Sequence, residues 1–161
     1  MAKARGISNY WLTALMSEGQ VLMNKADADR LVVGWPDEVA DEIGLGPADA
    51  VAVLTHDVKF DEPAIVAALA RGCRYVGAVG SRKTQADRHA RLLAAGVDPV
   101  DLARLRGPIG LDLGGRAPAE TALAIMAEIV AQRHGASGGS LAGKGAPKAR
   151  SAAPAPPAEP A

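Results

Sequence analysis

The sequence lacks most of the residues from which catalytic and metal centres are built. Cys73 is the only cysteine among 161 residues, which excludes an internal disulfide and a cysteine-rich metal site. No two of the three histidines have the spacing of metal ligands on one helix. No serine–histidine–acid set and no paired carboxylates stand at a spacing that indicates catalysis. We therefore expect neither catalytic residues nor metal ligands, and the residues by themselves do not indicate an enzyme.

Aromatic residues, charge of one sign and long apolar runs are also scarce. Aromatics make up 3% of the chain, too few for a surface on which nucleic-acid bases stack. The 18 basic and 18 acidic residues cancel, so no global field attracts nucleic acid or anionic lipid. No segment approaches the roughly 20 consecutive apolar residues that span a bilayer, and the N-terminus lacks the apolar core of a signal peptide. We expect a soluble, cytoplasmic protein with neither nucleic acid nor a membrane as partner.

Short apolar runs alternate with amphipathic stretches along the chain. AVAVLTHD (50–57) is almost continuously apolar, as expected of a strand covered on both faces. The alternation predicts an α/β fold, a Rossmann-like doubly wound parallel sheet, whose ligands bind at the carboxyl ends of the strands. We expect strands at 30–35, 50–57 and 74–80, and helices that begin at Pro36, after Asp61 as N-cap, at Lys83, near Pro99 and at Pro118. In the helix from Lys83, the apolar spacing predicts that Ala86, Ala90 and Leu93 are buried and that Asp87, Arg88 and Arg91 are exposed.

Composition divides the chain into three parts. Residues 1–25 can form a helix and a strand, a remnant of a first βαβ unit. Residues 26–135 form the Rossmann-like domain. Residues 136–161 are rich in Gly, Ala and Pro, with Leu141 as the only large apolar residue, so we expect a disordered tail.

The junction GSRK (80–83) ends a predicted strand and begins a helix. Against the phosphate-loop pattern G-x-x-x-x-G-K-[ST], the segment matches at Gly77, Lys83 and Thr84. Arg82 replaces the second glycine, which argues against hydrolysis of a nucleoside triphosphate. What remains is a helix N-terminus beside two basic side chains, which suits an anion. A turn with a solvated basic pair is the alternative interpretation.

Two further turns are candidates for the same site. The turn Thr55-His56-Asp57 follows a buried strand, where a histidine can act as acid, base or ligand, or the turn can simply cap the next helix. The stretch GPIGLDLGGRAP (107–118) has four glycines in 12 residues, which indicates close backbone approach to a ligand or to the rest of the chain. Asp112 is its only acid.

Three motifs form a specific set: T-H-D within 50–69, Y-x-G-x-x-G-S-R-K within 74–96 and P-I-G-L-D-L-G within 107–135. Together with ADRLVVGWPDEV (28–39), the set resembles the C-terminal Rossmann-like domain of the xanthine dehydrogenase accessory factors of the XdhC/CoxI type. The resemblance covers about residues 26–135.

The resemblance implies a chaperone rather than a catalyst. Such proteins hold molybdenum cofactor, assist its sulfuration alongside a cysteine desulfurase, and pass it to the apoenzymes of molybdenum hydroxylases such as xanthine or carbon monoxide dehydrogenase. The cofactor is a pterin with a phosphate, sometimes extended by a nucleotide, and this phosphate would suit the anion site. The motif positions that the resemblance marks for cofactor binding are Thr55, His56, Asp57, Gly80, Ser81, Arg82, Lys83, Gly110, Asp112 and Gly114.

The sequence departs from the family pattern in two places. Ala117 and Ala119 stand where the family commonly has Thr and Glu, which removes a helix cap worth roughly 1 kcal/mol. The family's usual first strand and glycine loop are not recognisable before residue 26, so a central strand of the sheet would be missing. Because unpaired strand edges favour association, we expect a homodimer, a separately encoded family partner or a rearranged N-terminus to fill the gap.

Two other functions stay open at the level of sequence. A NAD(P)- or flavin-dependent oxidoreductase fits the Rossmann pattern, although the G-x-G-x-x-G fingerprint and its following ribose-binding acid are missing. A truncated copy that acts as a non-catalytic interaction module fits the absent first strand.

The expected gap in the sheet predicts association in dilute solution. The purified chain should migrate as a dimer, or as a complex once a family partner is supplied, when its mass is measured by light scattering. A clean, well-folded monomer with an ordinary central strand would refute this expectation.

Overall fold

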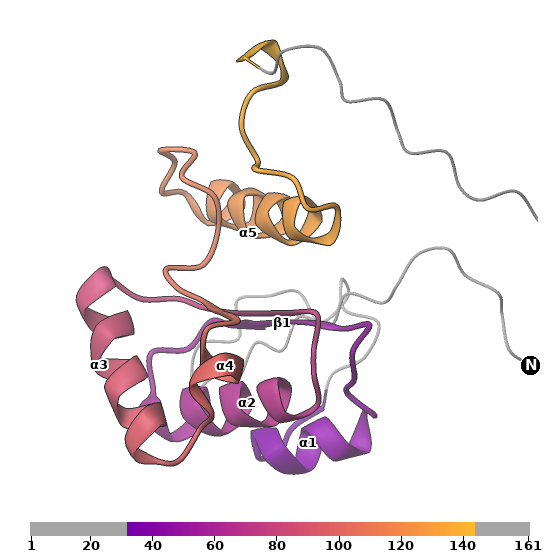
Figure 1. Cartoon of the computed structure of the whole chain (residues 1–161), viewed down its shortest axis with the longest axis vertical. Helices are drawn as coiled ribbons and strands as arrows, with labels where there is room; N and C mark the ends of the chain where they lie inside the picture. The colour runs from indigo at the N-terminus through magenta and orange to yellow at the C-terminus, as the bar shows by residue number, and fades with distance from the viewer. Residues whose placement is uncertain (1–31, 144–161) are drawn as a thin grey trace, which may run out of the picture.

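The computed structural model describes residues 32–143 (Figure 1). Of the strand expected at 30–35, the described residues 32–35 form no strand, and the side chain of Val33 is 91% exposed. Over residues 32–35 that expectation is wrong, because this segment leads into a helix and the Trp35 ring stacks on Phe60 with ring centroids 5.1 Å apart. Residues 30 and 31 lie outside the described residues. The elements are α1 (Pro36–Glu42), β1 (Ala50–Val53), α2 (Val58–Ala70), β2 (Tyr75–Ala78), α3 (Arg82–Ala94), α4 (Pro99–Leu102), β3 (Leu105–Arg106), α5 (Pro118–Arg133) and a 3-10 turn at Leu141–Gly143.

The three strands of the described residues form one parallel sheet in the order β1-β2-β3. Val53 pairs with Ala78 and Val76 pairs with Leu105 in the register. Every residue of β1 and β2 is buried, as a parallel sheet covered on both faces requires. The Rossmann-like α/β fold is thus confirmed, while β3, with only two residues, was too short to recognise as a strand from its sequence.

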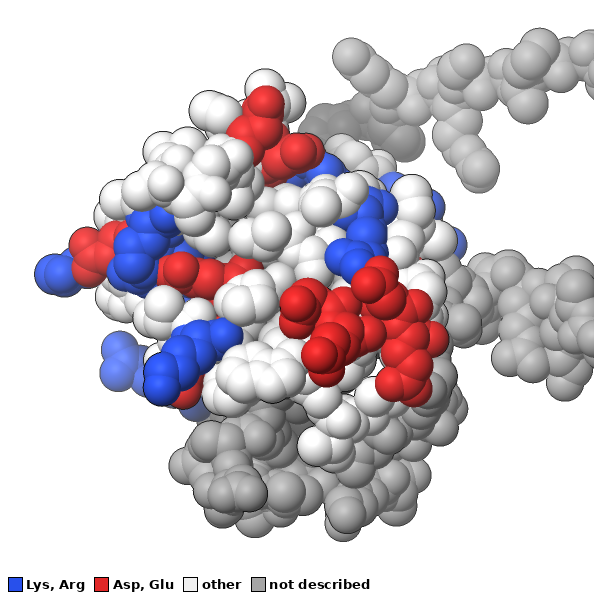
Figure 2. Space-filling view, turned by 90° about the horizontal axis from the view of Figure 1, so that it is seen from below, with Lys and Arg blue, Asp and Glu red and all other residues white. Residues whose placement is uncertain are grey.

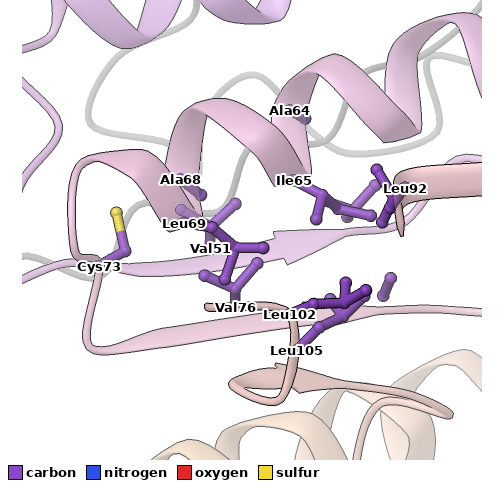
Figure 3. Packing of buried hydrophobic residues seen from close by; sticks show 12 residues of the cluster. Val51, Ala64, Ile65, Ala68, Leu69, Cys73, Val76, Leu92, Leu102 and Leu105 are labelled. Carbon is purple, nitrogen blue, oxygen red and sulfur yellow. The ribbon is translucent and has the colours of Figure 1, made fainter. Parts of the chain in front are cut away.

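Helices cover both faces of the sheet. On one face, α2, α3 and α4 pack against the strands around Ile65, Leu92 and Leu102, none of which is more than 1% exposed (Figure 3). On the other face, Ile125 and Ile129 of α5 pack on Ala50, Ala52 and Tyr75. Figure 1 shows α5 alone on its side of the described sheet, with α1 to α4 on the opposite side. This two-sided arrangement is the doubly wound architecture.

The two central helices begin directly after their strands. Asp57 is the N-cap of α2, and its side chain accepts a hydrogen bond from Lys59 N at 2.9 Å. The expectation that Asp61 caps this helix is therefore wrong: Asp61 lies inside the first turns and is only 2% exposed. Ser81 is the N-cap of α3, where its Oγ accepts from Thr84 N at 3.1 Å.

The buried face of α3 also differs from the prediction. Ala86, Ala90 and Leu93 are exposed, whereas Gln85, Arg88 and Leu92 are buried. These three positions follow the same helical spacing as a normal core stripe. Two of them are polar, which is why a search for apolar residues chose the wrong face.

Helix α5 begins at Pro118 although its N-cap residue is Ala117, which has no side-chain acceptor. Glu120 compensates from within the first turn: its Oε2 accepts hydrogen bonds from Arg116 N at 3.0 Å and from Ala117 N at 2.9 Å. Only half of a capping box is therefore present. The other half is a hydrogen bond from Glu120 N to the side chain at position 117, and it needs a hydroxyl or carboxylate there.

Parts of the predicted division of the chain lie outside the described residues, namely 1–31 and 144–161. Residues 136–143 are described: Ala136 N donates to Ala131 O at 2.7 Å, and Gly138 passes close to the Leu111 side chain. None of the described helices has the length and the apolar run that crossing a bilayer needs.

The half-formed cap of α5 can be completed. The Ala117→Thr variant is expected to raise the free energy of unfolding by about 1 kcal/mol, because the new hydroxyl can accept from Glu120 N. Urea unfolding monitored by circular dichroism measures the change. Ala122→Thr, at an exposed position inside the same helix, is the control and should bring no gain; an equal gain in both variants would contradict the capping argument.

Candidate functional site

Three turns leave the sheet at one edge, which we call the carboxyl edge because β1, β2 and β3 all end there. The parallel pairing places the turns after Val53, Ala78 and Arg106 side by side. Backbone hydrogen bonds join neighbouring turns: Val79 N donates to Val53 O at 3.0 Å, and Ile109 N donates to Ala78 O at 3.1 Å. The three segments predicted to form one site therefore begin at the same edge.

In the turn after β1, two of the three predicted residues have partners within the chain. The Thr55 hydroxyl donates to Asp61 Oδ1, and Asp57 caps α2. His56 is exposed, and its side chain has no hydrogen-bond partner among residues 32–143. Of this motif, only the imidazole of His56 is free to meet a ligand.

The turn after β2 has the same division between structural and free groups. Gly80 has φ +137°, which other residues rarely adopt, and Ser81 caps α3. Lys83 Nζ lies 2.7 Å from Asp87 Oδ2, one helical turn away, and this ammonium holds the pKa of the Asp87 carboxyl below its usual value. Arg82 is exposed and has no side-chain partner within the described part of the chain.

The two helix N-termini at the carboxyl edge differ in charge. The first turn of α2 contains Asp61, and its cap is the carboxylate of Asp57. The first turn of α3 contains no acid, and it carries Arg82 and Lys83. Because a helix N-terminus has a partial positive charge and unpaired amides, the start of α3 is the more favourable place for an anion.

The glycine-dense loop after β3 packs against the chain itself at three of its four glycines. A Cβ on Gly110, whose φ is +97°, would lie 3.3 Å from the backbone of α5. A Cβ on Gly107 would lie 2.3 Å from the Gln85 carboxamide, and one on Gly115 would lie 2.6 Å from Glu120. Only Gly114, with φ +76°, faces open space. Close packing of the loop therefore accounts for most of these glycines without a ligand.

Glu128 of α5 holds the same loop from the other face of the sheet. Its Oε2 accepts hydrogen bonds from Gly110 N at 2.8 Å and from the Tyr75 hydroxyl at 2.5 Å. Burial, and then the neighbouring carboxylate, raise the pKa of Tyr75 well above its ordinary value. Asp112, two residues after Gly110, is exposed.

A buried polar cluster that the sequence analysis missed lies beneath the first two turns. Arg88 Nη2 pairs with Asp61 Oδ2 at 2.8 Å, and the two side chains are 4% and 2% exposed. Arg88 Nη1 donates to Gln85 Oε1 at 2.6 Å and to Val79 O at 3.2 Å. Gln85 Nε2 donates to Ala78 O at 3.0 Å and to Val79 O at 3.1 Å. We call Thr55, Asp61, Gln85 and Arg88 the edge cluster.

One signal in the sequence could have revealed the edge cluster. Asp61 precedes Ile65 and Ala68 at helical spacing, so it belongs to the core stripe of α2. A buried carboxylate needs a cation or several donors. Arg88 occupies the corresponding stripe of the next helix, three residues after Gln85 and four before Leu92.

Other features of the described residues lie apart from the predicted site. A groove of about 620 Å³ runs between α2 and α3 and is lined by Pro63, Val66 and Leu92, among others. A smaller cavity lies under α1, and none of the ten predicted site residues lines either. Figure 2 shows the face that carries α1, α2 and α3, where side chains of both charges surround uncharged surface. Residues 32–143 contain no group of three His, Cys, Asp or Glu side chains that could hold a metal ion.

Cys73 lies at the opposite end of β2 from these turns. It is 1% exposed, and burial raises the pKa of its thiol. A buried thiol with a raised pKa reacts slowly, so Cys73 serves as a small core residue.

Comparison with known proteins gives the family. A family model described as the XdhC Rossmann domain matches residues 8–129, which is well over half of the chain. The matched range includes all three strands and all ten predicted site residues.

Two known proteins are similar to this chain over part of their length. A protein of Bacillus subtilis (strain 168), named as a probable subunit of xanthine dehydrogenase, is 32% identical over 106 residues, 66% of this chain and 30% of the relative. A crystal structure of a xanthine dehydrogenase from Bacillus halodurans matches with a TM-score of 0.56 and 28% identity, over 68% of this chain and 31% of that one. The chain thus spans less than a third of the length of these relatives.

The contact between Gly107 and Gln85 yields a test of how tightly the third turn adjoins the edge cluster. Gly107→Ala is expected to lower the free energy of unfolding by about 1–3 kcal/mol, because the new methyl group collides with the Gln85 carboxamide. Gly46→Ala is the matched control, since its Cβ would meet nothing closer than 3.9 Å. Urea unfolding compares the two. Equal stabilities would mean that the loop after β3 can move away from Gln85 at no cost.

Proposed function

The chain belongs to the XdhC family through its Rossmann domain, and on this premise we propose that it is an accessory factor in the maturation of a molybdenum hydroxylase. Both similar proteins carry the name xanthine dehydrogenase, so an enzyme of the xanthine or carbon monoxide dehydrogenase type is the proposed client. Because the chain spans less than a third of these relatives, the proposal concerns the Rossmann domain and what it binds.

The proposed ligand is molybdenum cofactor, held by its phosphate at the carboxyl edge. The observation that carries this assignment is the start of α3, an acid-free first turn with the guanidinium of Arg82 exposed and unpaired among the described residues. Backbone amides at a helix N-terminus and a guanidinium are the donors that a phosphate prefers. The residues present therefore fit the anionic end of this cofactor.

The other free side chains of the edge would act on the rest of the ligand. His56 can donate or accept a hydrogen bond. Asp112 can accept from the amino groups of a pterin, since an ionised carboxylate is an acceptor only. When bound, the cofactor supplies the molybdenum centre that the hydroxylase requires, while the chain itself binds and orients it.

We also propose the partners that this role requires. They are the apoenzyme that receives the cofactor, a cysteine desulfurase that provides sulfur for its sulfuration, and a second copy or a separately encoded family member. The cytoplasm is the proposed location. An oxidoreductase function is less well supported, because the turns after β1 and β2 lack the glycine fingerprint that brings a dinucleotide close to the backbone.

Titration of the purified chain with molybdenum cofactor, isolated anaerobically from a molybdenum hydroxylase, tests the proposal. Saturable binding is expected, and Arg82→Ala should weaken it about tenfold, as expected for one charge-assisted hydrogen bond. Asp112→Ala should weaken it as well. Quenching of the pterin's fluorescence gives the dissociation constants.

Arg74→Ala is the matched control for this titration. Arg74 is also an exposed arginine, but it precedes β2 and lies at the opposite edge of the sheet. Its loss should leave the affinity unchanged. Equal losses in Arg74→Ala and Arg82→Ala would reveal nonspecific attraction, and an unchanged affinity in both Arg82→Ala and Asp112→Ala would place the site elsewhere. Tight binding of NAD(P) with turnover would favour an oxidoreductase instead.

A further inference from the structure

Four polar side chains of the edge cluster connect turns that are far apart in the sequence. Thr55 comes from the turn after β1, Asp61 from α2, and Gln85 and Arg88 from α3. Their hydrogen bonds run without interruption from the Thr55 hydroxyl through Asp61 and Arg88 to Val79 O, and from Arg88 through Gln85 to Ala78 O. The first two turns of the candidate site are therefore joined by side chains as well as by the sheet.

The third turn meets the same cluster by steric contact. Gly107 passes so close to the Gln85 carboxamide that a single added carbon would lie 2.3 Å from it. Gln85 in turn is held by Arg88 and by two main-chain carbonyls, and it is 7% exposed. A shift of Gln85 would thus move both the end of β2 and the start of the loop after β3.

Stability alone gives a weak reason for this arrangement. Removing two charges from water is costly, and apolar residues of similar volume often replace a buried ion pair without loss of stability. What apolar residues cannot replace is the directional bonding of a carboxylate and a guanidinium to fixed partners. The cluster places four such bonds at the point where β1 and β2 end.

We propose that the edge cluster is the positioning device of the candidate site, with Asp61 and Arg88 as its central positioning residues. It holds the turns that carry His56 and Arg82 in one relative position before any ligand arrives. Neither central residue reaches the surface, so both act through the turns rather than by contact with the ligand. As a statement about ligand binding this inference rests on the proposed function, whereas as a statement about the turns it does not.

A double apolar variant separates positioning from stability. Asp61→Leu combined with Arg88→Met removes both charges and keeps the volume of the core nearly constant, so the urea midpoint should stay close to that of the unaltered chain. The rate of amide hydrogen exchange, measured by mass spectrometry in peptides that cover 54–58 and 79–84, should nevertheless rise about tenfold for each hydrogen bond of the cluster that is lost. A stable double variant with unchanged exchange in both peptides would overturn the proposal.

Thr55→Val provides a second and milder test. It removes one hydroxyl at nearly constant shape, and exchange should rise in both peptides although only the first contains the substitution. Ile65→Val is the matched control: Ile65 is fully buried in the same helix as Asp61, and its loss of one carbon weakens the core without removing any hydrogen-bonding group of the cluster. If the double variant does not fold, the Thr55→Val variant decides alone. Exchange in Thr55→Val that is no faster than in Ile65→Val would then count against the proposal.

The cofactor titration is then repeated on the same variants. The double variant and Thr55→Val should bind molybdenum cofactor about tenfold more weakly, while Ile65→Val binds as the unaltered chain does. If the unaltered chain itself binds no cofactor, the proposed function fails, and the exchange data still decide whether the cluster positions the turns. If the unaltered chain binds and the loosened variants bind equally well, the cofactor site is independent of the cluster and the positioning role in binding is wrong.

Discussion

The cost of burying charge governs the architecture of the carboxyl edge. Asp61 and Arg88 are almost completely removed from water, and neither can remain there without the other. Their pairing determines which face of α3 turns toward the sheet, and with it the place of Gln85 and the two carbonyls at the end of β2. The first two turns of the edge are joined through this pair.

A second carboxylate serves the same edge from the opposite face of the sheet. Glu128 of α5 holds the Tyr75 hydroxyl and the amide of Gly110, as Asp61 of α2 holds Thr55 and Arg88. Each layer of the doubly wound fold therefore contributes one acid to the turns. Because the acids belong to helices that pack on different faces, the edge depends on both layers being docked.

The side chains that remain free at this edge are the ones expected to meet a ligand. The side chains of Thr55, Asp57 and Ser81 all have partners inside the chain, whereas those of His56, Arg82 and Asp112 are exposed and have none among residues 32–143. A specific motif can therefore combine residues that build a turn with residues that use it. The ten predicted site positions divide in that way here.

The α/β fold class, the strands β1 and β2 and the approximate positions of the helices could be predicted from sequence, because apolar runs, prolines and turn glycines act locally and by fixed periods, and three motifs indicated the family. The two-residue strand β3 could not be predicted, and the strand expected at 30–35 does not form over the described residues 32–35. Gly44, Gly72 and Gly96, for example, follow the ends of α1, α2 and α3 with positive φ. The face of α3 and the role of Asp61 were decided only by tertiary structure. A charged residue in a core stripe is stable only if its partner, 27 positions away in the sequence, arrives at hydrogen-bonding distance, and no local pattern contains that pairing.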